Sequence, residues 1–163
     1  MLEETVNFCR ANPGSNLRDI RFVVFDQDQE LTAAFQQEME KLQPKQIGNS
    51  HLTVQVVNGD LTQENSTDAI VNILSTDMNM KNAGDLSKAI EKQSGPLVQQ
   101  ECNQLGKQTP GTAIVTSGGN LQVPHIIHII PGSSDKQHLQ QCLEEGLRVA
   151  DANNFQAISI PCV

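Results

Sequence analysis

The sequence predicts an α/β fold in which helices cover both faces of a β-sheet. Short aliphatic runs that are typical of strands alternate along the chain with amphipathic helical stretches. The chain has no Trp or Tyr and only five Phe, so its core must consist of Val, Ile, Leu and Ala, as in a sheet beneath helices. Its 163 residues are enough for one domain with a sizeable apolar core.

The first 42 residues predict a helix, a strand and a second helix. The first helix carries its apolar residues on one face and ends at Pro13-Gly14. The β-rich run at 20–25, Ile-Arg-Phe-Val-Val-Phe, predicts a strand. Asp28 is a plausible N-cap for the second helix. The stretch 43–50 contains Pro and Gly and has no periodicity, which makes it the best candidate for a linker.

From residue 52 onward, strands and helices alternate to the end of the sequence. The first strand alternates apolar and polar residues, and the later strands are buried aliphatic runs. The helices begin or end at glycine or proline, or carry leucines at helical spacing. The predicted strands are 52–57, 69–72, 112–116, 125–130 and 157–160, and the predicted helices cover 86–93, 96–105 and the stretch from 139 to 150.

Composition excludes several classes of function. The net charge of −8 argues against duplex nucleic acid as a partner, although backbone N–H groups at helix starts can still hold a small phosphate ligand. No apolar run is long enough to cross a membrane. The four widely spaced cysteines fit buried, reduced thiols better than a zinc site, and we expect all four histidines to be structural or solvated. We therefore expect no metal and a location in the nucleus, the cytoplasm or both.

The stretch 57–96 carries the most specific pattern in the sequence. This pattern consists of five short motifs, and the runs GTAIVTSGGNL, HIIHIIPG and AISIP follow them later in the chain. The motifs are Gly59-Asp60-Leu61-Thr62, Asp68–Asn72, Ala83-Gly84, Ala89-Ile90 and Ser94-Gly95-Pro96. In this order they resemble the macrodomain family, α/β modules that bind ADP-ribose. They look most like the tandem macrodomains of mono-ADP-ribosyltransferases.

The resemblance implies an adenine end and a ribose end for the ligand site. Asp60 follows a strand, where open α/β sheets bind ligands, and in the family its carboxylate accepts a hydrogen bond from adenine. Leu61 would contribute its backbone. From the residues alone, Asp60 could instead cap a turn. Asn72 ends a buried strand and would hold the distal ribose; otherwise it is a buried amide whose partners lie in a loop.

The same resemblance places the diphosphate at the start of the helix that begins near Leu86. Ala83 and Gly84 precede this helix, and Leu86 and Ser87 begin it. A glycine allows the backbone to approach a phosphate, and the helix dipole attracts it. The alternative is an ordinary loop that leads into a helix. Asp85 argues against phosphate at this point unless its carboxylate faces solvent or caps the helix.

The resulting functional prediction is a binding module for ADP-ribose, either free or attached to proteins. One alternative is an enzyme that removes ADP-ribose from proteins, and another is an interaction module with a degenerate pocket. Ser75 and the single Gly84 replace the asparagine and longer glycine run that hydrolytic relatives carry, so we expect no catalytic residue. No cofactor is expected, since NAD would serve a transferase domain elsewhere in a parent protein.

The resemblance also predicts how the chain is organised. Macrodomains continue beyond their Ile-Pro strand with a second phosphate loop, a helix, a strand and a helix. Residues 1–42 repeat the last three of these elements. We therefore interpret 1–46 as the tail of a preceding macrodomain and 47–163 as about the front two-thirds of the next, incomplete at its C-terminus. The alternative is that 1–46 is an unrelated N-terminal extension. We expect the strand at 20–25 to complete the sheet between the strands at 52–57 and 157–160; otherwise the segment is only the remnant of the neighbouring domain.

Overall fold

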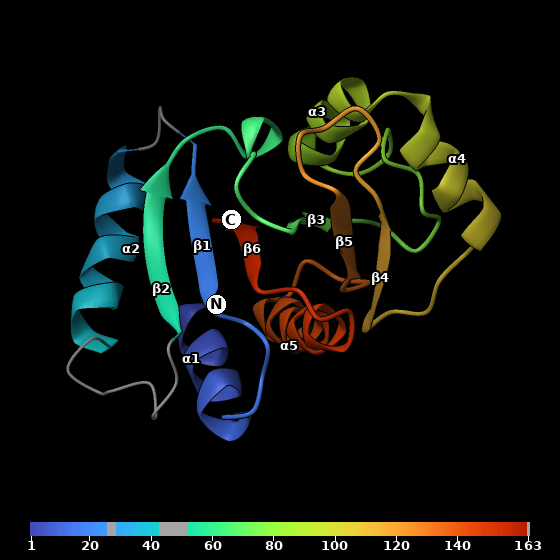
Figure 1. Cartoon of the computed structure of the whole chain (residues 1–163). Helices are drawn as coiled ribbons and strands as arrows, with labels where there is room; N and C mark the ends of the chain where they lie inside the picture. The colour runs from blue at the N-terminus through green and yellow to red at the C-terminus, as the bar shows by residue number, and fades with distance from the viewer. Residues whose placement is uncertain (26–28, 43–51, 163) are drawn as a thin grey trace.

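A computed structural model describes residues 1–25, 29–42 and 52–162, which form a six-stranded sheet with helices on both faces (Figure 1). The strands are β1 (Asp19–Val24), β2 (Thr53–Asn58), β3 (Ala69–Ile73), β4 (Thr112–Ser117), β5 (His125–Ile130) and β6 (Ala157–Pro161). The helices are α1 (Leu2–Ala11), α2 (Gln29–Leu42), α3 (Asp85–Ser94), α4 (Pro96–Leu105) and α5 (Lys136–Ala152), with a 3₁₀ turn η1 (Leu61–Gln63). The α/β prediction is confirmed. The expected Asp28 cap and the linker at 43–50 lie outside the described residues.

The strand order is β2-β1-β6-β3-β5-β4, and all neighbours are parallel except β4 and β5. Strand β1 therefore lies inside the sheet, where it separates β2 from β6 (Figure 1). Phe22 pairs with Val56 on one side and with Ile160 on the other. The prediction that the N-terminal strand completes the sheet between these two strands is confirmed.

Alternate residues of β1 explain why this segment can occupy an interior position. Ile20, Phe22, Val23 and Val24 are buried, whereas Asp19 and Arg21 are only partly buried. The second half of β1 is therefore a buried apolar run, as expected where a strand is covered on both faces. An interior strand also satisfies the backbone N–H and C=O groups on both of its edges. The segment thus supplies apolar surface and hydrogen-bonding capacity together.

Two apolar cores lie on opposite faces of the sheet, as the alternation of β5 shows. Ile127 and Ile129 belong to the core beneath α1, α2 and α5, whereas Ile126 and Ile130 belong to the core beneath η1, α3 and α4.

Three of the four cysteines are buried in these cores, and Cys162 is partly buried; all four thiols are free. Burial raises the pKa of Cys9 to about 12, so these thiols stay protonated at neutral pH.

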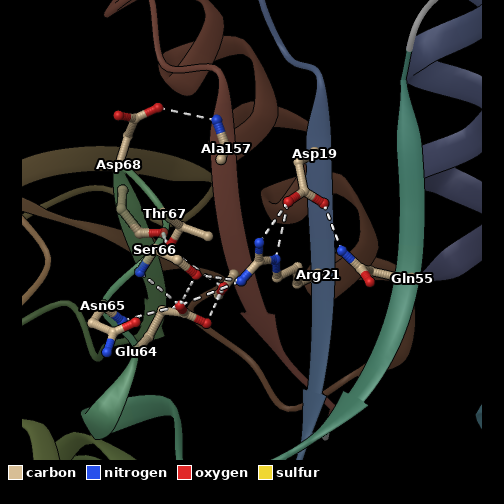
Figure 2. A network of polar contacts seen from close by, with 11 residues as sticks. Asp19, Arg21, Gln55, Glu64, Asn65, Ser66, Thr67, Asp68 and Ala157 are labelled. Atoms are coloured by element: carbon tan, nitrogen blue, oxygen red, sulfur yellow. Dashed lines mark hydrogen bonds and ion pairs between the residues drawn. The ribbon is translucent and has the colours of Figure 1, made fainter.

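A polar network joins β1 to the loop that follows η1 (Figure 2). The Arg21 guanidinium contacts Asp19 on its own strand at 2.9 Å, Glu64 at 3.6 Å and the Ser66 hydroxyl. The Glu64 carboxylate also accepts a hydrogen bond from Ser159 on β6 at 2.9 Å. Burial alone would raise the pKa of Glu64, but hydrogen bonds from Ser66 and Ser159 outweigh burial and lower it. The network therefore holds a charged clamp across β1, β6 and the loop.

Asp68 fixes the start of β6 beside β3. Its Oδ2 accepts hydrogen bonds from the backbone N–H of Gln156 at 2.7 Å and of Ala157 at 3.0 Å, and Figure 2 shows the second of these. Asp68 belongs to the Asp68–Asn72 motif of the sequence pattern. Asp68 therefore stabilises the pairing of strands in the sheet and lies away from the carboxyl ends of the strands.

Replacing Phe22 with Ala tests whether β1 is packed inside the sheet. Phe22 is completely buried and contacts the ring of Phe35, with 6.0 Å between ring centroids. We expect Phe22→Ala to lower the free energy of unfolding by about 3–5 kcal/mol in urea denaturation. Phe25→Ala is the control, because Phe25 is 60% exposed and should cost less than about 1 kcal/mol. Equal effects of the two variants would contradict the interior position of β1.

Candidate functional site

Pockets line the edge of the sheet where its parallel strands end. The strand-end pocket has a volume of about 420 Å³ and lies where β1, β2 and β6 finish, beside η1 and the first turn of α3. Asp60, Leu61 and Leu86, all predicted from the sequence, line it. The carboxyl ends of parallel strands are the usual place for ligands in open α/β sheets.

Asp60 caps the 3₁₀ turn η1, which confirms the turn-capping role that the sequence offered as one of two interpretations. Its Oδ1 accepts hydrogen bonds from the backbone N–H of Thr62 at 2.9 Å and from the Thr62 hydroxyl at 2.7 Å. The side chain is exposed, and within the described part of the chain nothing donates a hydrogen bond to Oδ2. Capping uses one carboxylate oxygen and leaves the other free to accept a hydrogen bond from a ligand.

A second pocket, the loop pocket, has a volume of about 360 Å³ and includes Ala83 and Gly84. It lies between the loop before α3 and the residues that follow β5, such as Gly132. Gly84 occupies the N-cap position of α3 with an extended backbone, and an added Cβ would meet nothing within 4 Å. The protein's own packing does not require glycine at this position. The first N–H groups of α3 lack a side-chain cap and are available to an anion.

Asp85 does not obstruct this arrangement. Its carboxylate is fully exposed at the rim of the strand-end pocket and lies 3.7 Å from the Lys88 ammonium group. Solvent and the ion pair offset its charge, which answers the difficulty that the sequence raised.

Asn72 and Ser87 face the interior, away from both pockets. The Asn72 side chain is completely buried, and its Oδ1 accepts a hydrogen bond from the Ser87 hydroxyl at 2.8 Å. Its Nδ2 lies 3.2 Å from His128 Nδ1. The structure thus shows a buried amide, whose partners come from α3 and β5 and not from a loop. Direct contact between Asn72 or Ser87 and a ribose stays a prediction.

His128 is held in its neutral form. It is completely buried between Asn72 and Thr116, and its Nε2 lies 2.9 Å from the Thr116 hydroxyl. Burial lowers its pKa to about 4, although the charge of Glu101 acts in the opposite direction. His125 stacks on Phe155 and His138 is exposed beside Asp135, whereas His51 lies outside the described residues.

Strands β1 and β6 bring to the strand-end pocket residues that the sequence pattern did not indicate. Val23 and Phe25 come from the N-terminal segment, and Pro161 and Cys162 come from the end of β6. Phe25 is exposed and adds an aromatic ring to this pocket. An aromatic residue directly after the carboxyl end of a strand was the signal that could have identified it.

No set of three His, Cys, Asp or Glu side chains within 1–25, 29–42 and 52–162 is arranged for a metal ion. In the same ranges, no helix has the length and apolarity needed to span a membrane.

A family model settles the resemblance seen in the sequence. The model described as Macro domain matches residues 71–163. The chain belongs to the macro domain family. The human protein mono-ADP-ribosyltransferase PARP14 is 38% identical over 67% of this chain, and the match spans 6% of that protein. ADP-ribose glycohydrolase MACROD2 of Xenopus laevis is 32% identical over 64% of the chain and 26% of its own length.

Further relatives of this macro domain include bacterial proteins. The O-acetyl-ADP-ribose deacetylase of Salmonella typhimurium is 32% identical over 68% of the chain and 65% of its own length. The solved Oceanobacillus iheyensis macrodomain with ADP is 27% identical, with a TM-score of 0.54 over 63% of this chain and 60% of that one. The chain therefore spans less than two-thirds of the length of each of these relatives.

The burial of His128 predicts how stability changes with pH. Its pKa is lowered from 6.5 to about 4 in the folded protein, so between these values the unfolded chain binds a proton that the folded chain does not. Stability is complete above pH 6.5 and falls as the pH drops toward 4. We expect a loss of about 2 kcal/mol between pH 7 and pH 5, measured by urea denaturation.

His128→Gln should remove most of this dependence, and His138→Gln should keep it. The carboxylates with lowered pKa, among them Glu64, contribute mainly below pH 4.5 and do not produce the same effect. An equal fall in stability for wild type and His128→Gln between pH 7 and pH 5 would contradict this assignment.

Proposed function

We propose that this macro domain binds ADP-ribose, free or attached to proteins, along the edge where its parallel strands end. One observation carries the proposal. Asp60, whose capping bonds use only Oδ1, lines a largely apolar pocket of about 420 Å³ together with the exposed Phe25. The names of the relatives, which are ADP-ribose glycohydrolase, O-acetyl-ADP-ribose deacetylase and mono-ADP-ribosyltransferase, support the same ligand.

The adenine would occupy the strand-end pocket. Its exocyclic amine donates a hydrogen bond to Asp60 Oδ2, while Oδ1 keeps the cap on η1. The ring of Phe25 and the side chain of Leu86 supply apolar contact, and Leu61 contributes its backbone. A carboxylate acceptor makes this hydrogen bond stronger than one between neutral groups.

The diphosphate would lie across Ala83 and Gly84, at the N-terminal end of α3. The open space above Gly84 admits the phosphates, and the uncapped N–H groups of the helix and its dipole stabilise their charge. The distal ribose then enters the loop pocket, near Ser75 and Gly132. A ligand in this orientation contacts both pockets at the same time.

The names of the glycohydrolase and deacetylase relatives also favour a second candidate function, hydrolysis of ADP-ribose conjugates. The lining of the loop pocket argues against it, because the lining residues are aliphatic or carry hydroxyls and none carries an ionisable side chain. The Ser75 hydroxyl donates to Asp77 Oδ1 at 2.6 Å, and this bond lowers the pKa of Asp77. The described residues that line this pocket thus include no general base, and the lowered pKa makes the neighbouring Asp77 a weaker base for the activation of water.

We also propose that the segment 1–46 descends from the tail of a neighbouring macro domain within a tandem protein of the ADP-ribosyltransferase kind. NAD would serve a transferase domain elsewhere in such a parent, which would act in the nucleus, the cytoplasm or both. The sequence of the parent transcript on either side of this chain tests the proposal.

Asp60→Asn tests the adenine end without removing the cap, because asparagine also accepts the Thr62 N–H through its Oδ1. The amide places a donor where Oδ2 accepted. We expect the binding free energy for ADP-ribose to weaken by about 1–3 kcal/mol in isothermal titration calorimetry.

Asp151→Asn is the matched control. Asp151 Oδ1 likewise accepts a backbone N–H, from Asn16 at 2.7 Å, and the residue does not line either pocket. Its substitution should leave the affinity unchanged. If wild type binds ADP-ribose and Asp60→Asn binds it equally well, Asp60 is not part of the site.

The absence of a base in the loop pocket predicts no hydrolytic activity. The purified chain, incubated with a mono-ADP-ribosylated protein, should release no more ADP-ribose than buffer does. A rate of release that rises in proportion to the concentration of the chain would overturn this expectation.

A further inference from the structure

A chain of four buried polar side chains crosses the core beneath the candidate site. It runs from Ser87 in the first turn of α3 through Asn72 on β3 and His128 on β5 to Thr116 on β4. The three links measure 2.8, 3.2 and 2.9 Å. None of the four side chains is more than 3% exposed, and the residues around them belong to the apolar core beneath α3 and α4.

The hydrogen bonds of this chain have one consistent direction. The Ser87 hydroxyl donates to Asn72 Oδ1, and because an amide nitrogen can only donate, Asn72 Nδ2 donates to His128 Nδ1. Neutral His128 then carries its hydrogen on Nε2 and donates it to the Thr116 hydroxyl. Thr116 in turn donates to the Ser117 carbonyl at 3.1 Å. Each link therefore fixes the orientation and protonation of the next.

The far end of the chain is anchored to a second helix. The backbone N–H of Ser117 donates to the Glu101 carboxylate of α4 at 2.8 Å, and the Ser117 hydroxyl donates to the other carboxylate oxygen. Buried polar groups add little net stability compared with well-packed apolar side chains of the same shape. What a fully satisfied network supplies is a defined orientation of the elements that it joins.

The element at the near end is the one that carries the proposed ligand contacts. Ser87 follows Leu86, which lines the strand-end pocket, and Gly84, which lines the loop pocket. We propose that the relay Ser87–Asn72–His128–Thr116 positions the first turn of α3 for its ligand. His128 and Thr116 are then positioning residues that act on the ligand through α3, and Asn72 links them to that helix. The consequence for affinity rests on the proposed binding of ADP-ribose.

Two nearly isosteric substitutions cut the relay at its ends. Ser87→Ala removes the donor to Asn72, and Thr116→Val removes the acceptor for His128. Each should weaken ADP-ribose binding by about five- to tenfold in calorimetry, as for the loss of one ordinary hydrogen bond. Thr116→Ser keeps the hydroxyl and should restore the affinity. Wild-type affinity in Thr116→Val would overturn the proposal.

Matched controls separate positioning from general loss of stability. Ser94 is a buried serine at the other end of α3, and its hydroxyl bonds to the backbone of its own helix region. Thr5 is a buried threonine on α1 whose hydroxyl donates to the Met1 carbonyl on the other face of the sheet. Ser94→Ala and Thr5→Val should lower stability to a similar degree yet keep the affinity within about twofold. Equal losses of affinity in all four variants would show a structural role only.

The double variant Ser87→Ala/Thr116→Val tests whether the two ends belong to one unit. If either cut breaks the same relay, the combined loss of affinity should be clearly smaller than the product of the single losses. Independent sites, in contrast, would give the full product. That result would overturn the relay.

Nuclear magnetic resonance of the ligand-free protein separates the relay from the proposed function. The ¹⁵N shifts of His128 should identify the tautomer with hydrogen on Nε2. Thr116→Val should move the backbone amide signals of residues 85–88, and Thr5→Val should leave them in place. If wild type fails to bind ADP-ribose while these amides move, the proposed function fails and the relay stands. Unmoved amides in Thr116→Val overturn the relay whatever the ligand does.

Discussion

Strand β1 must find hydrogen-bonding partners on both of its edges, and the rest of the structure depends on this requirement. It meets β2 on one side and β6 on the other, although these strands lie far apart in the sequence. Without β1 the sheet would have two open edges in its interior. The same strand brings Val23 and Phe25 beside Pro161 and completes the strand-end pocket. The fold and the candidate site of this macro domain therefore depend on the same interaction.

Much of the fold could be predicted from local patterns. Aliphatic runs and helix-terminal glycines identified the strands and helices, and the interior position of β1 followed from comparing its segment with the end of a macrodomain. The clamp between Arg21, Glu64 and Ser159 could not be predicted, because it joins side chains from three separate segments whose register only the sheet defines. The sequence predicted that Asp60 could cap a turn, but not that the turn is a 3₁₀ helix, because a helix of three residues has no periodicity to detect.

The candidate site was predicted in part. Asp60 and Leu86 line the strand-end pocket, and Ala83 and Gly84 line the loop pocket. Asn72 faces inward because β3 is covered on both faces, and a sequence pattern does not reveal which face receives a polar side chain. Phe25 was missed because it comes from outside the stretch that carries the pattern. The relay joins side chains from four different elements, and only the tertiary structure brings His128 together with Asn72 and Thr116, the partners that fix its tautomer.

Hydrogen exchange of the backbone amides, followed residue by residue, tests the central position of β1 most directly. An interior strand bonds the amides along both of its edges, whereas an edge strand such as β2 leaves alternate amides open to water. The structure predicts that every amide from Ile20 to Val24 exchanges as slowly as those of β3, through global unfolding. Exchange of these amides at the rate of an unstructured peptide, while β3 and β5 remain protected, would contradict it.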